Sequence, residues 1–299
     1  MLGLPAEFNS DFLARLEQLR IKTRREYAGS GKGGHLSPRR GTSLEFNDFR
    51  HYTLGDDVRF IDWGLYGRTD KLYIKLFKEE EGLLSYIFLD ASASMGLPDG
   101  DRKFELSVVL ALALAYVALT SGDRVMVRVL GGEGKTADIG FVYGRHRIID
   151  LARRLAAIRP SGSIDLAHAL AGELVTIRRA GKVFVISDYL MAPDSISRGL
   201  GLFTAANMDV TAVQIVGGRE LEGAGLSGDV EVVDSESGEV VRIAMGPLER
   251  ERHRESLKRM SLDLRAFCLR NGLHYTLYDT ATSFHEFFLR AVAELGLVH

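Results

Sequence analysis

The chain has 299 residues, of which 46% are hydrophobic and 26% charged, and its formal net charge is −2. This composition is typical of a folded globular protein with a sizeable core, and it excludes a largely disordered chain. Because basic and acidic residues nearly balance, nothing indicates nucleic-acid binding, and we expect protein or small-molecule partners.

Cysteine content and apolar runs bear on the compartment. The single cysteine, Cys268, excludes an internal disulfide and is predicted to be a buried helical thiol. The first residues, "MLGLPAEFNSDFLARLEQL", lack the pattern of a secretory signal. The longest apolar run, Val108 to Leu119, is shorter than the roughly 20 residues that a bilayer requires. We therefore expect a cytoplasmic protein without a membrane span.

Residues 1–81 are predicted to form a unit distinct from the rest. An amphipathic helix from about Ser10 to Tyr27 opens this unit, and its leucines are spaced to pack on the main body. Residues 28–41, rich in glycine, serine and basic side chains, have the composition of a loop. The segment 41–81 follows, with a dense pattern of charged and aromatic residues.

Residues 82–299 alternate short apolar runs with helical patterns. Strands are predicted at 85–92, 124–130, 136–144, 182–188, 209–217 and 273–279, and helices at 102–122, 145–159, 164–181, 195–208, 247–272 and 283–298. Near-continuous β-branched runs between helices predict an α/β fold with a doubly wound, mainly parallel six-stranded sheet. Two alternating runs around 235–238 predict an inserted β-hairpin at about 228–245.

Common catalytic and phosphate-binding motifs are not found. In "GGEGKT" and "GSGKGG" the first glycine of a phosphate-binding loop is missing at the required spacing. The sequence has no H-E-x-x-H, G-x-S-x-G or paired C-x-x-C, and its histidines lack metal-ligand spacing. The candidate chemistry is therefore limited to carboxylates and hydroxyls.

The stretch "FLDASASMG" contains the most informative of these groups. Asp90 ends the first strand of the sheet, and Asp188 ends the strand at 182–188. Loops at the carboxyl ends of parallel strands meet at one crevice, so both carboxylates should face it. Ser92 and Ser94 follow Asp90 at alternate positions. Hard oxygen donors of this kind suit Mg²⁺ or another divalent cation better than zinc.

"DASAS" resembles the D-x-S-x-S motif of the von Willebrand factor type A fold, whose metal-ion-dependent adhesion site holds a divalent cation. The resemblance implies that Ser92 and Ser94 bind the metal and that Asp188 supplies the aspartate of the third loop. In the second loop, "SGSIDLAHAL", Ile164 stands where the family has threonine. Ser163 or Asp165 would have to supply that ligand, directly or through water.

Residues 41–81 resemble the signature of the domain of unknown function 58 (DUF58) proteins: Arg-x-Tyr, Gly-Asp-Asp-x-Arg, Ile-Asp-Trp and Lys-x-Phe-x-Glu-Glu. The match continues into the type A domain and is dense over residues 40–190. The resemblance implies an association with MoxR-type AAA+ ATPases in chaperone-like assembly of client proteins.

The charges of this signature have two interpretations. Acidic and basic residues interleave here, which is typical of ion pairs that fix a turn. They are Asp56, Asp57 and Asp62 with Arg50, Arg59 and Arg68. The alternative is a surface that recognises a partner. Trp63 is predicted to be a core anchor.

Two classes of function follow from the sequence. One is a non-enzymatic, metal-dependent protein-interaction module that acts as an adaptor for an ATPase. The other is a Mg²⁺-dependent phosphoryl-transfer or hydrolase enzyme with Asp90 as the nucleophile. Haloacid dehalogenase-type enzymes place a general-acid aspartate two residues after the nucleophile, where this chain has Ser92. The serine favours the interaction module.

Overall fold

The computed structural model describes residues 4–24, 45–54, 56–78, 82–98, 100–133, 139–222, 228–233 and 240–298. The chain divides into two compact units, one made of Met1–Arg25 and Leu84–His299, the other of Glu26–Leu83. The first 25 residues thus go with the larger unit, whereas the sequence placed residues 1–81 in one segment. The smaller unit is an insertion in the larger one.

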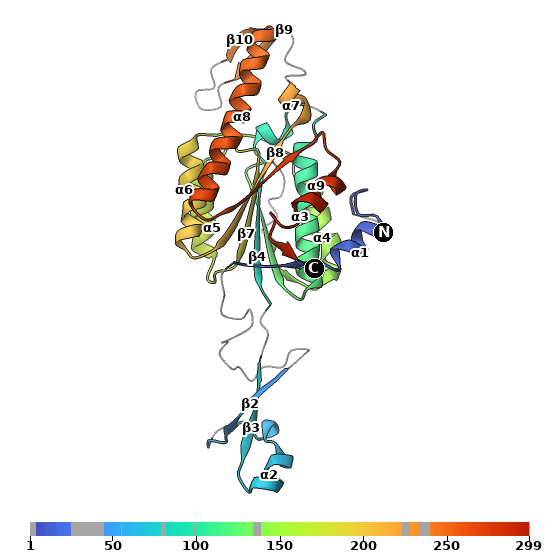
Figure 1. The fold of residues 1–299 in the computed structure, drawn as a ribbon, viewed down its shortest axis with the longest axis vertical. Helices are drawn as coiled ribbons and strands as arrows, with labels where there is room; N and C mark the ends of the chain where they lie inside the picture. Colours follow the sequence, from blue (N-terminus) through green and yellow to red (C-terminus); the bar gives the residue numbers. More distant parts are fainter. Residues whose placement is uncertain are drawn as a thin grey trace. The chain divides into compact units, whose positions relative to one another are not determined.

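The larger unit is built on a six-stranded sheet (Figure 1). Its strands in spatial order are β11 (His274–Asp279), β8 (Asp209–Val216), β7 (Lys182–Ser187), β4 (Leu84–Asp90), β5 (Arg124–Leu130) and β6 (Ile139–Tyr143). All neighbours are parallel except β5 and β6. This is a doubly wound order. It confirms the predicted α/β, von Willebrand factor A-like and Rossmann-type fold class.

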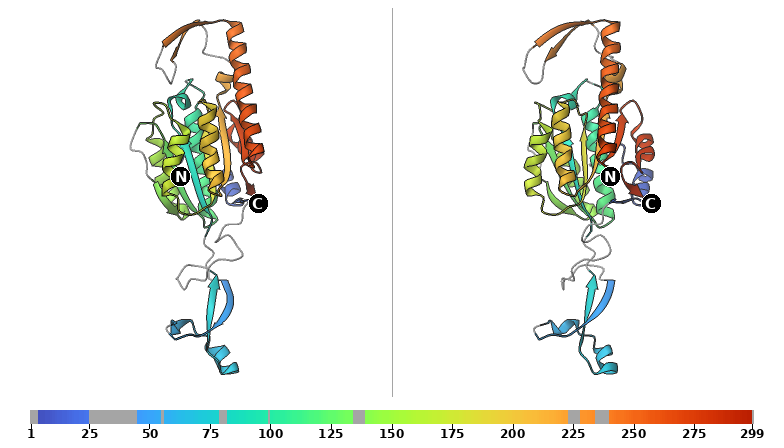
Figure 2. Two further views of the ribbon diagram at one scale, coloured as in Figure 1. Left: turned by 90° about the vertical axis from the view of Figure 1, so that its left-hand side faces the viewer. Right: turned by 60° about the vertical axis from the view of Figure 1, so that its left-hand side comes forward.

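Helices cover both faces of the sheet (Figure 2). On one face lie α1 (Ser10–Leu16), α3 (Lys103–Thr120), α4 (Ile148–Ala156) and α9 (Phe284–Ala291). On the other lie α5 (Leu166–Thr176), α6 (Pro193–Ala205) and α8 (Pro247–Arg270). Every residue of β4, β7 and β8 is buried because both faces are covered, which explains why their sequences are mostly apolar.

Helix α3 has the length and composition of a membrane-spanning helix, with a mean hydropathy of 1.7. Within the described residues it is the one helix that meets this test, and 89% of it is buried inside the fold. Its apolar side chains pack against the sheet, α1 and α4. The helix is therefore the centre of one layer of the core.

Several element boundaries differ from those predicted. Helix α1 ends at Leu16 rather than near Tyr27, because the chain turns into β1 (Arg20–Ile21), which pairs with β12 (Leu297–Val298). Helix α5 ends at Thr176 rather than at Gly181. Gly181 has another role: a Cβ there would stand 2.2 Å from the carbonyl oxygen of Leu84, so only glycine allows the close approach to β4.

A hairpin interrupts the α/β alternation after β8. The short helix α7 (Gly218–Glu222) precedes it, and β9 (Gly228–Val233) pairs antiparallel with β10 (Val240–Met245). This confirms the predicted hairpin at 228–245; its predicted turn at 235–238 lies outside the described residues. Cys268 of α8 is buried, as predicted, and burial raises the pKa of its thiol to about 12.

Aromatic side chains attach α1 to the main body. Asn9 caps the helix by accepting the Phe12 N–H. The Phe12 side chain, 2% exposed, lies with its ring centroid 5.6 Å from that of Phe284 and 5.3 Å from that of Phe288. Edge-to-face contacts of this kind stabilise beyond the area that they bury. They explain why the first residues belong to the larger unit.

The smaller unit consists of the antiparallel pair β2 (Glu45–His51) and β3 (Tyr73–Lys78), a 3₁₀ turn (Val58–Phe60) and α2 (Trp63–Thr69). Its interleaved charges fix local turns, as the ion-pair interpretation predicts. Arg50 pairs with Asp56, and Arg59 with Asp57. Asp62 caps α2 by accepting the Leu65 N–H. The Arg50 hydrogen bond holds the pKa of the Asp56 carboxyl well below its usual range.

The prediction that Trp63 anchors a core is wrong. Trp63 is 63% exposed at the first position of α2, and its ring centroid lies 6.1 Å from that of Tyr66. Among the side chains of this unit whose burial is described, the buried apolar ones are Ile61 and Ile74, which also pair as an isolated β-bridge. A unit of this length buries only part of its surface, and the indole at the start of α2 lies on the exposed part.

Candidate functional site

The candidate site lies where β4 and β7, neighbouring parallel strands, end at the same edge of the sheet. Asp90 is the last residue of β4, and Asp188 directly follows β7. In a doubly wound sheet the chain connections diverge at this point and leave a crevice, which is the usual position of a ligand. Both carboxylates are therefore placed as the sequence predicts.

Asp90 is 1% exposed, and hydrogen bonds hold both of its carboxylate oxygens. Oδ1 accepts the Ser92 N–H at 2.7 Å, and Oδ2 accepts the Ser187 hydroxyl at 2.6 Å. Burial, followed by the charge of Asp188, raises the pKa of Asp90 to about 6. Neither of these two donors carries a charge, so they do not neutralise the negative charge of the ionised carboxylate.

This raised pKa predicts how stability depends on pH. The folded chain holds the Asp90 proton more tightly than the unfolded chain does, and this contributes to the free energy of unfolding in full below pH 3.8, where both states are protonated. The contribution is lost as the pH rises through about 6. We expect Asp90→Asn, which cannot ionise, to gain about 3 kcal/mol relative to wild type between pH 4 and pH 8. Urea unfolding of both proteins in EDTA measures this change. If the difference in free energy of unfolding between Asp90→Asn and the wild type is the same at pH 4 and at pH 8, the prediction is wrong.

The two serines after Asp90 lie side by side. The Ser92 and Ser94 hydroxyl oxygens are 3.1 Å apart and border a cavity of about 460 Å³. Ser163 and Asp165 line the same cavity from the loop before α5. The Ala93 N–H donates to the Gly162 carbonyl at 2.8 Å, which joins the two loops. The first and second loops thus meet as predicted.

Asp165 caps α5 in addition to lining the cavity. Its Oδ1 accepts the His168 N–H and the Ser195 hydroxyl, each at 2.9 Å. These hydrogen bonds lower the pKa of Asp165. Ile164 packs near Gly131, where a Cβ would stand 2.7 Å from the isoleucine methyl. The residue at the threonine position of the type A motif is therefore engaged in packing, and Ser163 and Asp165 remain at the cavity.

A buried lysine, which the sequence analysis did not identify, contacts Asp188. Lys103, at the start of α3 and 2% exposed, places its Nζ 3.1 Å from Asp188 Oδ2 and 3.1 Å from Glu220 Oε2 of α7. The other oxygen of Asp188 accepts the Leu190 N–H. Lys103 stands after Arg102 at a helix start, where a solvent-exposed cation is the ordinary expectation. Its second carboxylate partner lies on α7, a helix that was not predicted.

The sequence of this chain matches the model of one protein family. The model of the family described as "Protein of unknown function DUF58" matches residues 48–265. The chain belongs to the DUF58 family. The match includes residues 48–81 of the signature segment and the loops that carry Asp90, Ser163 and Asp188.

This DUF58 chain has uncharacterised relatives. It is 29% identical over 242 residues to "Uncharacterized protein Rv1480" of Mycobacterium tuberculosis (strain ATCC 25618 / H37Rv), covering 80% of this chain and 75% of the relative. The same values hold for "Uncharacterized protein Mb1516" of Mycobacterium bovis.

Solved structures similar to the DUF58 chain include "conserved hypothetical protein BatB" from Bacteroides thetaiotaomicron. That structure has a TM-score of 0.43 and 15% identity, covering 72% of this chain and 98% of that chain. Another is manganese-loaded TRAP protein from Plasmodium vivax, with a TM-score of 0.36 and 10% identity, covering 73% of this chain and 75% of that chain.

The donor set of this DUF58 site fits a hard cation only in part. Ser92 and Ser94 offer hydroxyl oxygens at a cavity, and the buried carboxylate of Asp90 lies behind them. Asp188 fits less well, because Lys103 and the Leu190 N–H already occupy its two oxygens. Among the described residues, no group of three or more His, Cys, Asp or Glu side chains is placed to hold a metal. Hydroxyls and water would supply most of the ligands.

Proposed function

We propose that this protein is a non-enzymatic interaction module that binds protein partners at the carboxyl edge of its sheet, with Mg²⁺ or another divalent cation at the Ser92–Ser94 pair. The observation that carries the proposal is this pair of hydroxyls at the mouth of a cavity, above the buried charge of Asp90. Ser92 and Ser94 would hold the cation directly, and Asp90 would act through water. When bound, the cation supplies an exchangeable position for a partner carboxylate.

The geometry of Asp90 supports binding rather than covalent catalysis. A nucleophile must reach its substrate, whereas Asp90 is 1% exposed and both of its oxygens accept hydrogen bonds from the protein. We expect no hydrolysis of an aryl phosphate above the blank, with or without Mg²⁺. A turnover that Asp90→Asn abolishes would establish the alternative, a phosphoryl-transfer or hydrolase enzyme.

The cation part of the proposal is tested by denaturant unfolding with MgCl₂ or MnCl₂ against EDTA. Cation at about 100 times its dissociation constant should stabilise the wild type by about 2–3 kcal/mol. Ser92→Ala/Ser94→Ala should lose this stabilisation, because both hydroxyl ligands are removed. Ser261→Ala, which removes a half-buried hydroxyl of α8, is the matched control and should keep it. Equal stabilisation of the double variant would show that the cation binds elsewhere.

The resemblance to DUF58 proteins suggests the partner. We propose a MoxR-type AAA+ ATPase and its clients, with the ATPase supplying the energy for assembly. The direct measurement is association of the purified ATPase with the wild type and with Ser92→Ala/Ser94→Ala, in Mg²⁺ and in EDTA. Undiminished association of the double variant in EDTA would refute the cation bridge while leaving the adaptor role in place. No association of the wild type in Mg²⁺ would refute the ATPase partner.

A further inference from the structure

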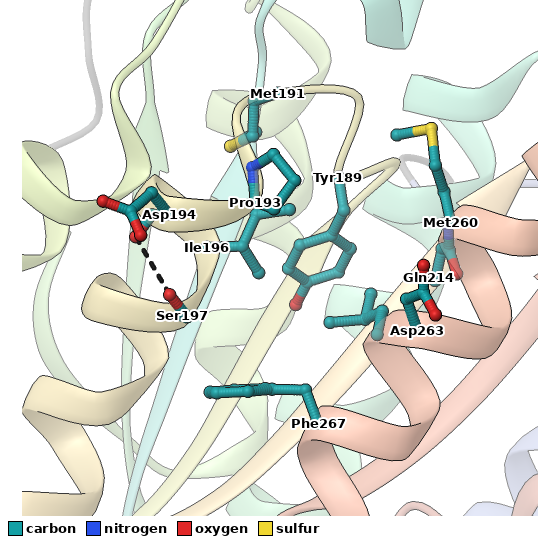
Figure 3. Close-up of a pocket in the computed structure, with 11 residues that line it drawn as sticks. Tyr189, Met191, Pro193, Asp194, Ile196, Ser197, Gln214, Met260, Asp263 and Phe267 are labelled. Atoms are coloured by element: carbon teal, nitrogen blue, oxygen red, sulfur yellow. Dashed lines mark hydrogen bonds between the residues drawn. The ribbon is translucent and has the colours of Figure 1, made fainter.

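A second cavity, of about 290 Å³, lies between α6 and α8 on the face of the sheet opposite α3 (Figure 3). Its lining is mostly apolar, with Ile196 from α6 and Leu264 and Phe267 from α8. Met191 and Met260 border it from opposite sides (Figure 3). Unbranched thioether side chains adapt to different bound shapes, which is why methionine is common at surfaces that bind peptides. The volume suits one or two bulky side chains rather than a large cofactor.

The cavity shares one loop with the candidate site. Met191 lines both cavities. Tyr189, whose ring forms part of the wall in Figure 3, directly follows Asp188 and has a φ of 57°, a left-handed conformation that is unusual for a bulky residue. Its N–H donates to the Ser187 hydroxyl, which in turn donates to Asp90. Strained backbone of this kind is concentrated at functional sites.

A second wall residue connects the same two places. The Gln214 side-chain amide donates to the Asp188 carbonyl at 3.2 Å, and its oxygen accepts the Tyr275 hydroxyl at 2.7 Å. Gln214 is 3% exposed, so these bonds fix it at the base of the cavity. A group bound in this cavity would contact side chains that are hydrogen-bonded to the loop of Asp188.

The charged groups that line the cavity are both acidic. Asp194 and Asp263 are exposed, on α6 and α8 respectively. Asp194 has a loose pair with Arg198, whose Nε lies 3.8 Å from its carboxylate, and both side chains are largely exposed. An apolar floor with two carboxylates at its rim complements a bulky apolar side chain next to a lysine or arginine.

We propose that this cavity is a specificity pocket for the protein partner, and that it receives a bulky apolar side chain whose basic neighbour pairs with Asp194 and Asp263. The inference rests on the proposed function in taking the partner to be a protein at this edge of the sheet. It adds a requirement on the partner's sequence that the cation site does not impose. The pocket does not need the cation in order to bind.

The test uses two defined peptides, acetyl-Ser-Leu-Lys-Leu-Lys-Ser-amide and its charge-reversed counterpart with Glu in place of Lys. Each is titrated into the full-length protein carrying ¹³C-methyl methionine, in EDTA. The lysine peptide should move the methyl signals of Met191 and Met260 and bind about tenfold more tightly than the glutamate peptide. Unmoved signals, or equal affinities for the two peptides, would overturn the proposal. An apolar amine that binds as tightly as the lysine peptide would show a small-molecule pocket instead.

Charge reversal at the rim provides the matched variants. Asp263→Lys should cut the preference for the lysine peptide to less than about threefold, because one rim carboxylate becomes a cation. Glu255→Lys makes the same change at an exposed position of α8 outside the pocket, and it should retain the tenfold preference. Ser92→Ala/Ser94→Ala should also retain it. The preference for the lysine peptide is therefore independent of whether a cation binds at Ser92 and Ser94. Conversely, a failed peptide titration would not affect the stabilisation by Mg²⁺ or Mn²⁺.

Discussion

Lys103→Met is expected to lower the free energy of unfolding by about 3–5 kcal/mol. Lys103 is 1% exposed at its side chain and pairs with Asp188 and Glu220, whose side chains are 2% and 11% exposed. Removing the ammonium leaves two carboxylates in a water-poor site without their shared cation. A buried charge without a partner destabilises the fold by more than the intact ion pair stabilises it. Urea unfolding at pH 7 in EDTA measures the change.

Two controls separate loss of charge from loss of packing. Lys258→Met, at an exposed position of α8, should change the free energy of unfolding by no more than about 0.5 kcal/mol. Adding Asp188→Asn and Glu220→Gln to Lys103→Met should recover most of the loss, because no buried charge is then left unpaired. A single variant as stable as the wild type would show that water reaches these carboxylates.

The same variant bears on the cation proposal. Without Lys103 the carboxyl edge has a larger negative excess, so added Mg²⁺ should stabilise Lys103→Met more than it stabilises the wild type. A purely structural lysine would leave the two Mg²⁺ effects equal. The difference between the two effects is therefore the quantity to measure.

Phe12→Ala should also lower the free energy of unfolding by about 3–5 kcal/mol. The ring is 2% exposed, and its centroid lies 4.8 Å from that of His285 as well as close to Phe284 and Phe288. Truncation leaves a cavity between α1 and α9 that the surrounding rings fill only in part. Urea unfolding gives the magnitude, and faster hydrogen exchange in α9 would locate the effect.

Arg15→Ala is the control on α1, because Arg15 lies one turn after Phe12 but is exposed, so its truncation leaves no buried cavity. Its effect should stay within about 0.5 kcal/mol. If Phe12→Ala costs no more than Arg15→Ala, α1 is not docked on the main body in solution.

The sheet and the first loop of the site could be predicted from sequence because each depends on local pattern. Unbroken apolar runs ending in Asp90 and at Asp188 predict central parallel strands, and the topology of a doubly wound sheet then brings the two ends together. Ser92 and Ser94 follow within the same loop. Their placement needs no information from distant parts of the chain.

The features that were missed depend on distant contacts or on the size of a unit. Lys103 is paired with Glu220, more than a hundred residues away on a helix too short to give a periodic signal. The cavity beside Tyr189 requires α6 and α8 to be placed side by side. Trp63 was expected in a core because it is aromatic, but it stands at the exposed start of α2 in a short unit, and short units leave much of their surface exposed.

The packing of α1 against α9 has a consequence for synthesis on the ribosome. Phe12 is synthesised well before Phe284 and Phe288, and the sequence separation between them is a delay on the order of tens of seconds at about 5–20 residues per second. The unit Glu26–Leu83 lies between the two partners in the sequence and is synthesised before α9. A nascent chain thus exposes the Phe12 ring until α9 has been made, and a product truncated before α9 keeps it exposed, where chaperones and proteases recognise unfinished proteins.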